Sequence, residues 1–103
     1  MEGVLKEELL RLKELQKSYA REIRKLPRGS LQSKQIKGRP YLYLVSSKNS
    51  KLSYRYLGGM REEEIQKLKG DIALRKKYQG FLKAVRLDIK RITKILYGRK
   101  RAV

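Results

Sequence analysis

The sequence predicts an α+β protein in which two long helices flank a small antiparallel β-ribbon of two or three strands. Residues 1–26 and 62–97 carry apolar side chains at the three- and four-residue spacing of an amphipathic helix. Between them, residues 34–59 alternate tyrosines with lysines and arginines, which is typical of strands. We therefore expect a single elongated domain, an antiparallel coiled-coil-like helical hairpin that carries the ribbon and ends in a basic tail at 98–103.

The first helix is predicted by its apolar seam. It should end at Leu26, because Pro27 disfavours helical geometry in the residue before it. Acidic and basic residues are mixed on its remaining faces, as in a solvated helix supported by i,i+4 pairs. The seam consists of Leu5, Leu9, Leu12, Tyr19, Ile23 and Leu26.

The ribbon is clearest at residues 41–45, an aromatic and β-branched run bounded by Pro40 and a polar cluster. Residues 48–50 predict a hairpin turn, after which residues 52–57 return as the partner strand. A second turn signal at residues 38–40 would let a short first strand, near residues 34–37, fold onto the next. An isolated hairpin is marginally stable, so one face should pack against the helices or a third strand.

The four tyrosines of the ribbon have two interpretations. Period-two geometry puts Tyr41 and Tyr43 on one face of their strand, and Tyr54 and Tyr56 on one face of the other. In the first interpretation they are half-buried core residues with hydroxyls at the edge. In the second, some of the rings and Arg55 form a platform that stacks on bases or lies along a nucleic-acid backbone. The pattern does not decide which face is buried.

The second helix begins at residues 62–64, whose three glutamates favour the positive end of the helix dipole. Its seam weakens between Gly70 and Gly80, which favours a bend there. If the ribbon closes a helical hairpin, Ile23 should lie near Ile65 and Leu5 near Leu82. The apolar residues beyond Leu82 would then be bare, and we predict a homodimer formed through Val85, Ile89, Ile92 and Leu96.

The charge of the chain indicates its class of partner. The net charge is +18, the pI is about 10.4, and no acidic residue lies between Glu22 and Glu62. Such self-repulsion is normally tolerated because a polyanion neutralises it, so nucleic acid, DNA or RNA, is the expected partner. The candidate binding residues are Lys34, Lys37, Arg39, Tyr41, Tyr43, Lys48, Lys51, Tyr54, Arg55 and Tyr56 of the ribbon, and Lys83, Arg86, Lys90, Arg91 and Lys94, largely opposite the second seam.

Several functional classes are disfavoured. The chain has no histidine and no cysteine, and neither a phosphate-binding loop nor a nucleophile with its base can be assembled. We expect no enzymatic activity, no cofactor and no metal. Acidic residues stand where a signal peptide would be basic, and no apolar run is long enough for a membrane span. These features favour a cytoplasmic protein without membrane contact.

The order LPRGSLQSKQIKGRPYLYLV, then a polar turn, SYRYLGG and the acidic helix start EEEIQKL, resembles an uncharacterised family of small bacterial and phage proteins. The resemblance covers about residues 26–68. It implies a charged helix, a basic aromatic hairpin and a trailing helix, but no activity, because that family is a domain of unknown function. The hairpin is also similar to basic β-ribbon arms of transposases and integrases, which implies nucleic-acid binding by analogy.

Three functions are consistent with these features. In the first, the ribbon and the helix from Ile72 to Arg101 together clamp a phosphate backbone without catalysis. In the second, the chain is an interaction protein, encoded by a phage or mobile element, that inhibits a nuclease or another nucleic-acid enzyme by occupying its acidic or nucleic-acid-binding surface. In the third, it is a structural coiled-coil oligomer with solubilising charge. A protein partner in a nucleoprotein complex would fit the first or the second.

Overall fold

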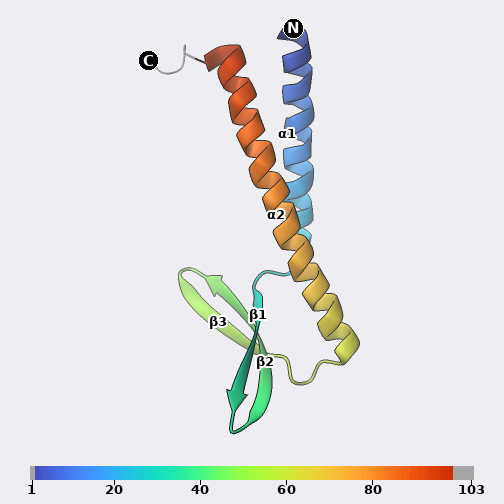
Figure 1. The fold of residues 1–103 in the computed structure, drawn as a ribbon, viewed down its shortest axis with the longest axis vertical. Helices are drawn as coiled ribbons and strands as arrows, with labels where there is room; N and C mark the ends of the chain where they lie inside the picture. Colours follow the sequence, from blue (N-terminus) through green and yellow to red (C-terminus); the bar gives the residue numbers. More distant parts are fainter. Residues whose placement is uncertain (1, 99–103) are drawn as a thin grey trace. The chain divides into compact units, whose positions relative to one another are not determined.

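The structure, a computed structural model, describes residues 2–98 and contains two helices and a three-stranded antiparallel sheet (Figure 1). This confirms the predicted α+β fold. The elements are, in order, α1 (Glu2–Lys25), β1 (Ser30–Ile36), β2 (Arg39–Lys48), β3 (Lys51–Tyr56) and α2 (Glu62–Tyr97). Residues 99–103, which include most of the predicted basic tail and the end of the predicted clamp at Arg101, lie outside the described residues.

The chain divides into two compact units, and the boundary between them falls within α2. The helical unit contains α1 and the part of α2 from Lys76 onward, whereas the sheet unit contains residues 26–75. Each unit has its own buried apolar residues. These are Leu9, Leu12, Ile23, Leu82 and Val85 in the helical unit, and Val45, Leu57 and Ile72 in the sheet unit.

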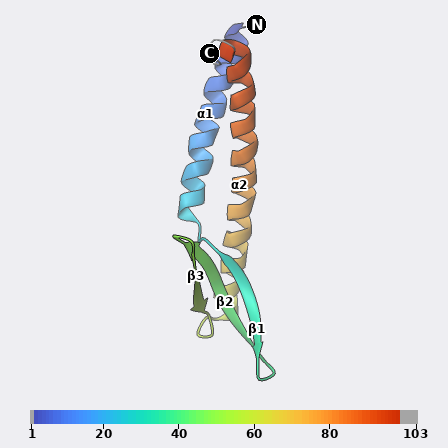
Figure 2. The same ribbon diagram turned by 90° about the vertical axis from the view of Figure 1, so that its left-hand side faces the viewer.

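In the helical unit, α1 runs antiparallel beside the later part of α2 (Figures 1 and 2). The ring of Tyr19 lies 5.9 Å from that of Tyr78 and 5.6 Å from that of Phe81, centroid to centroid. The expected pairing of Ile23 with Ile65 is therefore wrong, and so is that of Leu5 with Leu82. A physical reason is that Arg75 interrupts the apolar seam of α2, so that α1 finds its aromatic and apolar partners from Tyr78 onward.

This register covers the stripe that we expected to be bare. Val85 is only 7% exposed, and Ile89, Ile92 and Leu96 are half-buried in the same compact unit as α1. The stripe therefore gives no support to the homodimer that we predicted through it. The expected bend is also not required, since α2 stays helical through Gly70 and Gly80.

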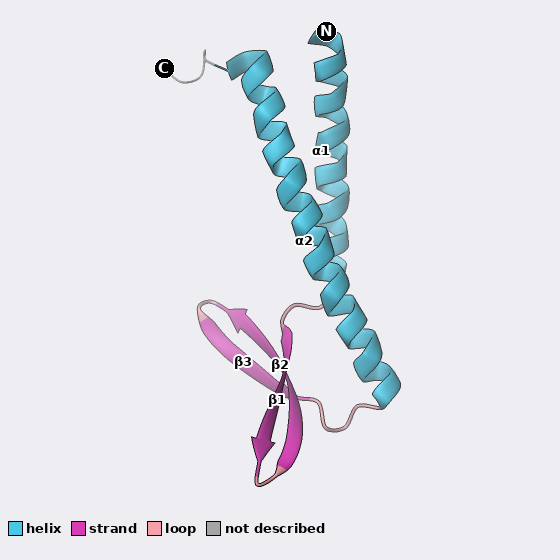
Figure 3. Cartoon of the chain, viewed as in Figure 1, coloured by secondary structure: helices cyan, strands magenta, loops and turns pink. Residues whose placement is uncertain are grey.

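In the sheet unit, β2 is the central strand, and only residues 43–45 of it pair with both neighbours. Residues 39–42 pair with β1 alone, and residues 46–48 pair with β3 alone. The sheet therefore consists of two hairpin arms that share a short centre (Figure 3). The candidate first strand is confirmed, although it begins at Ser30, before the predicted ribbon.

Both arms end in tight two-residue turns. Asn49 and Ser50 have φ values of 53° and 64°, and Lys37 and Gly38 have values of 53° and 78°. Positive φ at both central residues is the mark of type I′ turns, whose twist matches that of the strands. The predicted turn at residues 48–50 is confirmed, but the other turn lies one residue earlier than expected, with Arg39 and Pro40 already in β2. Each tip carries cations: Lys37 and Arg39 at one, Lys48 and Lys51 at the other.

Candidate nucleic-acid interface

The pairing register brings all four tyrosines of the sheet onto one face. Tyr43 of β2 lies opposite Tyr56 of β3, and Tyr41 lies opposite Lys34 of β1. Directly opposed residues in antiparallel strands point to the same side, as do residues two apart in one strand. We call the resulting set, Lys34, Tyr41, Tyr43, Tyr54 and Tyr56, the tyrosine face.

The four rings form one contact group. Tyr43 and Tyr56 have ring centroids 5.6 Å apart, and Tyr41 lies 5.9 Å from Tyr56. Tyr54 meets Tyr43 edge-on at 6.4 Å, with an interplanar angle of 83°. Tyr41 and Tyr43 are half-buried, whereas Tyr54 and Tyr56 are 47% and 56% exposed. The group therefore presents two aromatic rings to solvent and supports them with two others.

The cation in contact with the rings is Lys34. Its Nζ atom lies 4.1 Å from the ring centroid of Tyr54 and 5.5 Å from that of Tyr43, within the range of a cation–π interaction. We expected Arg55 to join the tyrosines, but Arg55 pairs with Leu44 and therefore lies on the other face. The platform that combines Arg55 with the rings is thus wrong, and Lys34 takes that place.

The remaining candidate residues divide between the two faces and the tips. Arg39 is two residues before Tyr41 in β2, so it lies on the same side of the sheet as the tyrosines. Lys48 pairs with Lys51, and both share the opposite face with Arg55 and the half-buried Leu42 and Leu44. Lys37 occupies a turn. The structure therefore brings together the tyrosines, Lys34 and Arg39, but not the cations of the second arm.

The cations of the sheet have no carboxylates near them in sequence. Strands and turns 30–56 contain six lysines or arginines and no acidic residue. Acidic partners of lysines and arginines occur within the helices or at a helix start, as between Arg61 Nε and Glu64 Oε1 at 3.0 Å. In α1, for example, Arg11 donates from Nε to Glu8 at 3.0 Å, and this hydrogen bond lowers the pKa of the Glu8 carboxyl. The strands and turns of the sheet therefore contain no carboxylate of their own to neutralise their positive charge.

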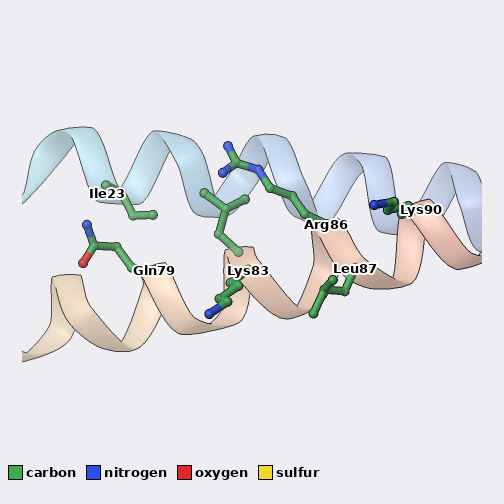
Figure 4. Close-up of a pocket in the computed structure, with 7 residues that line it drawn as sticks. Ile23, Gln79, Lys83, Arg86, Leu87 and Lys90 are labelled. Carbon is green, nitrogen blue, oxygen red and sulfur yellow. The ribbon is translucent and has the colours of Figure 1, made fainter.

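The candidate cations of α2 lie in the helical unit, where three of the five line a groove (Figure 4). The groove has a volume of about 530 Å³. We expected these cations largely opposite the apolar seam, and Lys83, Arg86 and Lys90 line the groove together with Leu82 of that seam. The other two candidates do not line it: Arg91 Nη1 lies 3.5 Å from Asp88 Oδ1, and Lys94 is exposed. The groove is lined by Ile23 of α1 and by Gln79, Leu82, Lys83, Arg86, Leu87 and Lys90 of α2.

A family model described as a domain of unknown function, DUF6788, matches residues 5–67, which is more than half of the chain. The chain belongs to the DUF6788 family. The match includes nearly all of α1 and the whole sheet of this DUF6788 protein, so it extends further towards the N-terminus than the resemblance in the sequence. No curated protein and no solved structure matches the chain.

Within residues 2–98 of the DUF6788 chain, no three His, Cys, Asp or Glu side chains are grouped so that they could hold a metal ion. Neither of its two described helices has a segment long and apolar enough to cross a membrane.

Two features of the DUF6788 chain escaped the sequence analysis. The ring of Tyr56 lies against Gly58, although the Gly58-Gly59 pair was interpreted only as the end of a strand. The groove was also missed, because Leu87 lies outside the three- and four-residue seam and its contact with the groove depends on the register of the helices.

Proposed function

We propose that the sheet unit binds nucleic acid without catalysis and that the tyrosine face is its contact surface. The observation that carries this proposal is the clustering of four tyrosine rings around one lysine, on a sheet with no acidic residue. A face that served only as core would be covered, but Tyr54 and Tyr56 are about half exposed.

Stacking would supply one part of the affinity. Exposed aromatic rings on basic sheets stack with unpaired bases, and each stacked base contributes about 1–3 kcal/mol. Tyr54 and Tyr56 are the rings available for this contact. The bases of a duplex are already stacked on one another, so we expect single strands to bind more tightly than duplexes of the same length.

Charge would supply the other part. Lys34 lies over the rings of Tyr43 and Tyr54, where its ammonium can meet the phosphate next to a stacked base. Arg39 lies on the same side, toward the tip of the first arm. These contacts do not depend on base identity, so the proposed binding has little sequence preference.

The predicted clamp also included the cations of α2. We assign the nucleic acid to the sheet alone, because Lys83, Arg86 and Lys90 border an apolar groove. A phosphate backbone has no aliphatic group with which to fill such a groove, whereas the sheet offers rings and charge together.

The test is a binding series followed by fluorescence anisotropy, with a labelled oligothymidine, the matching duplex and a structured RNA at low and high salt. We expect binding that is tightest for single strands and weakens steeply with salt, with a log–log slope of about −0.7 for each phosphate contacted. Tyr54→Leu and Tyr56→Leu should each weaken single-strand binding by about 5- to 100-fold. Tyr54→Phe and Tyr56→Phe keep the ring and should bind nearly as the parent does.

The double change Lys51→Glu with Arg55→Glu separates charge from stacking, since both residues lie on the face away from the tyrosines. The double variant should bind all three nucleic acids more weakly, by similar factors, and its helical circular dichroism should be unchanged. Absent or salt-insensitive binding to all three would overturn the proposed function. If the Tyr→Leu variants bind as the parent does and the double variant binds more weakly, charge contributes to the affinity and base stacking does not, which would overturn the proposed stacking.

A further inference from the structure

The groove in the helical unit combines an apolar floor with a basic wall. Ile23 and Leu82, which are 9% and 8% exposed, belong to the floor, and Leu87, at 48%, extends it toward solvent. Lys83, Arg86 and Lys90 line the same groove, and none of them takes part in an ion pair among residues 2–98. Aliphatic surface and unneutralised cations are thus exposed side by side.

On the α1 side, the residue that lines the groove is Ile23. Ile23 follows Tyr19 by one helical turn, so both belong to the stripe of α1 that faces α2. At about 100° per residue, Lys13 and Arg24 project about a quarter of a turn from this stripe, and both are exposed. The cations that line the groove therefore come from α2.

We infer that this groove binds an acidic amphipathic helix of a protein partner. A helix with leucines on one stripe and glutamates beside it would cover Leu87 and neutralise the cations of α2 that line the groove. Lys83 and Lys90 are seven residues apart on α2, so they lie about 10 Å from each other along the helix, a distance of two turns. A third helix laid against α1 and α2 would complete a three-helix bundle, the usual way of thickening the thin core of a helical pair.

Other anions fit the groove less well. A nucleic-acid backbone would engage the lysines but leave the apolar floor in water. A lipid would place its acyl chain on the floor, but it needs its cations at one end, where the headgroup lies, and the cations here are spread over two turns of α2. An acidic helix is the occupant whose charge and apolar surface both match.

The test uses a synthetic peptide of about three heptads, with leucine at positions a and d and glutamate at e and g, titrated into the full chain by calorimetry. We expect a Kd in the micromolar range and a stoichiometry of one peptide per chain. A peptide of the same composition in scrambled order should not bind. Lys83→Glu with Lys90→Glu should weaken binding at least about 10-fold, as should Leu87→Asp alone.

Arg21→Glu is the matched control. Arg21 is exposed on α1, about 160° around the helix from Ile23, so it lies away from the groove. Its replacement by glutamate changes the net charge by the same amount as Lys83→Glu or Lys90→Glu does. It should leave peptide binding within about twofold, and thermal melting should show that every variant is folded.

The inference does not depend on nucleic-acid binding by the sheet. It is overturned if the ordered and scrambled peptides bind equally, if the groove variants bind as Arg21→Glu does, or if no binding occurs up to about 1 mM peptide. Oligothymidine or vesicles of phosphatidylglycerol that displace the peptide from the parent chain, and whose own binding falls in the groove variants, would assign the groove to those ligands and also overturn it.

Discussion

The phenol ring of Tyr56 occupies the space in which a side chain at position 58 would begin. A Cβ atom on Gly58 would lie 2.0 Å from both Cζ and the hydroxyl oxygen of Tyr56, far inside van der Waals contact. Gly58 is therefore the surface on which this ring rests. Its missing side chain determines where one of the two exposed rings of the tyrosine face lies.

We predict that Gly58→Ala displaces the Tyr56 ring without unfolding the sheet, because the atoms in the way belong to the far end of a side chain. The contacts of Tyr56 with Tyr41 and Tyr43 would be lost, which should lower the free energy of unfolding by about 0.5–1.5 kcal/mol. NMR shifts of the tyrosine rings, with urea denaturation, measure both effects. Gly59→Ala is the control, since nothing lies within 4 Å of its Cβ position. Equal effects of the two substitutions would show that the ring does not depend on Gly58.

Lys34 should stabilise the aromatic group through its charge. Lys34→Met keeps the length of the side chain and removes the ammonium from the faces of Tyr43 and Tyr54. We expect a loss of about 0.5–1 kcal/mol in the free energy of unfolding, as for exposed cation–π pairs. Lys34→Arg should retain the stability. A Lys34→Met variant as stable as the parent in urea would rule out a contribution from the cation.

Lys48 and Lys51 are like charges in directly opposed positions at the end of one arm. Lys51→Glu should convert their repulsion into attraction and raise the free energy of unfolding by about 0.2–1 kcal/mol. The same change should weaken nucleic-acid binding, so stability and affinity should move in opposite directions. The double variant Lys48→Glu with Lys51→Glu restores like charges and should return the stability to the parental value, as measured in a double-mutant cycle. A rise in both stability and affinity would show that the charge of Lys51 does not contribute to nucleic-acid binding.

Leu12 is the most deeply buried residue of α1, at 4% exposed. Leu12→Ala leaves a cavity between the helices and should lower the free energy of unfolding of the helical unit by about 2–5 kcal/mol. Leu10→Ala removes the same atoms from a position that is 66% exposed, and should change it by less than about 0.5 kcal/mol. Thermal melting of the helical circular dichroism compares the two. Similar melting temperatures would mean that α1 is not held by this seam.

The sequence predicted the elements of this fold better than their pairing. Residues 41–45 are aromatic and β-branched, which identifies the central strand, and Asn49 readily adopts the positive φ of the hairpin turn. β1, in contrast, is polar and largely exposed, so its first residues carried no hydrophobic pattern. Its existence depends on the backbone hydrogen bonds that it makes with β2.

The candidate site was predictable in its members but not in its arrangement. Alternation shows which tyrosines share a face within one strand, but only the register shows that Tyr43 lies opposite Tyr56. Alternation alone puts Arg55 on the other face, since it stands between Tyr54 and Tyr56 in β3, whereas the position of Lys34 depends on the register of β1. The predicted register of the two helices was wrong because it followed from their lengths and not from the match between their apolar residues. Tyr19, Tyr78 and Phe81 form a large aromatic cluster, which favours the observed register.

Because β2 is paired on both sides only at residues 43–45, most of its length is an edge strand, as are β1 and β3 throughout. Open edges of this kind invite another chain to add a strand, and aggregation is the common result. Lysine and arginine on edge strands oppose such addition, because two copies would bring like charges together. Arg39, Lys48 and Lys51 should therefore oppose strand addition between copies of the chain. Their replacement by neutral residues should lower solubility, whether or not a nucleic acid is present.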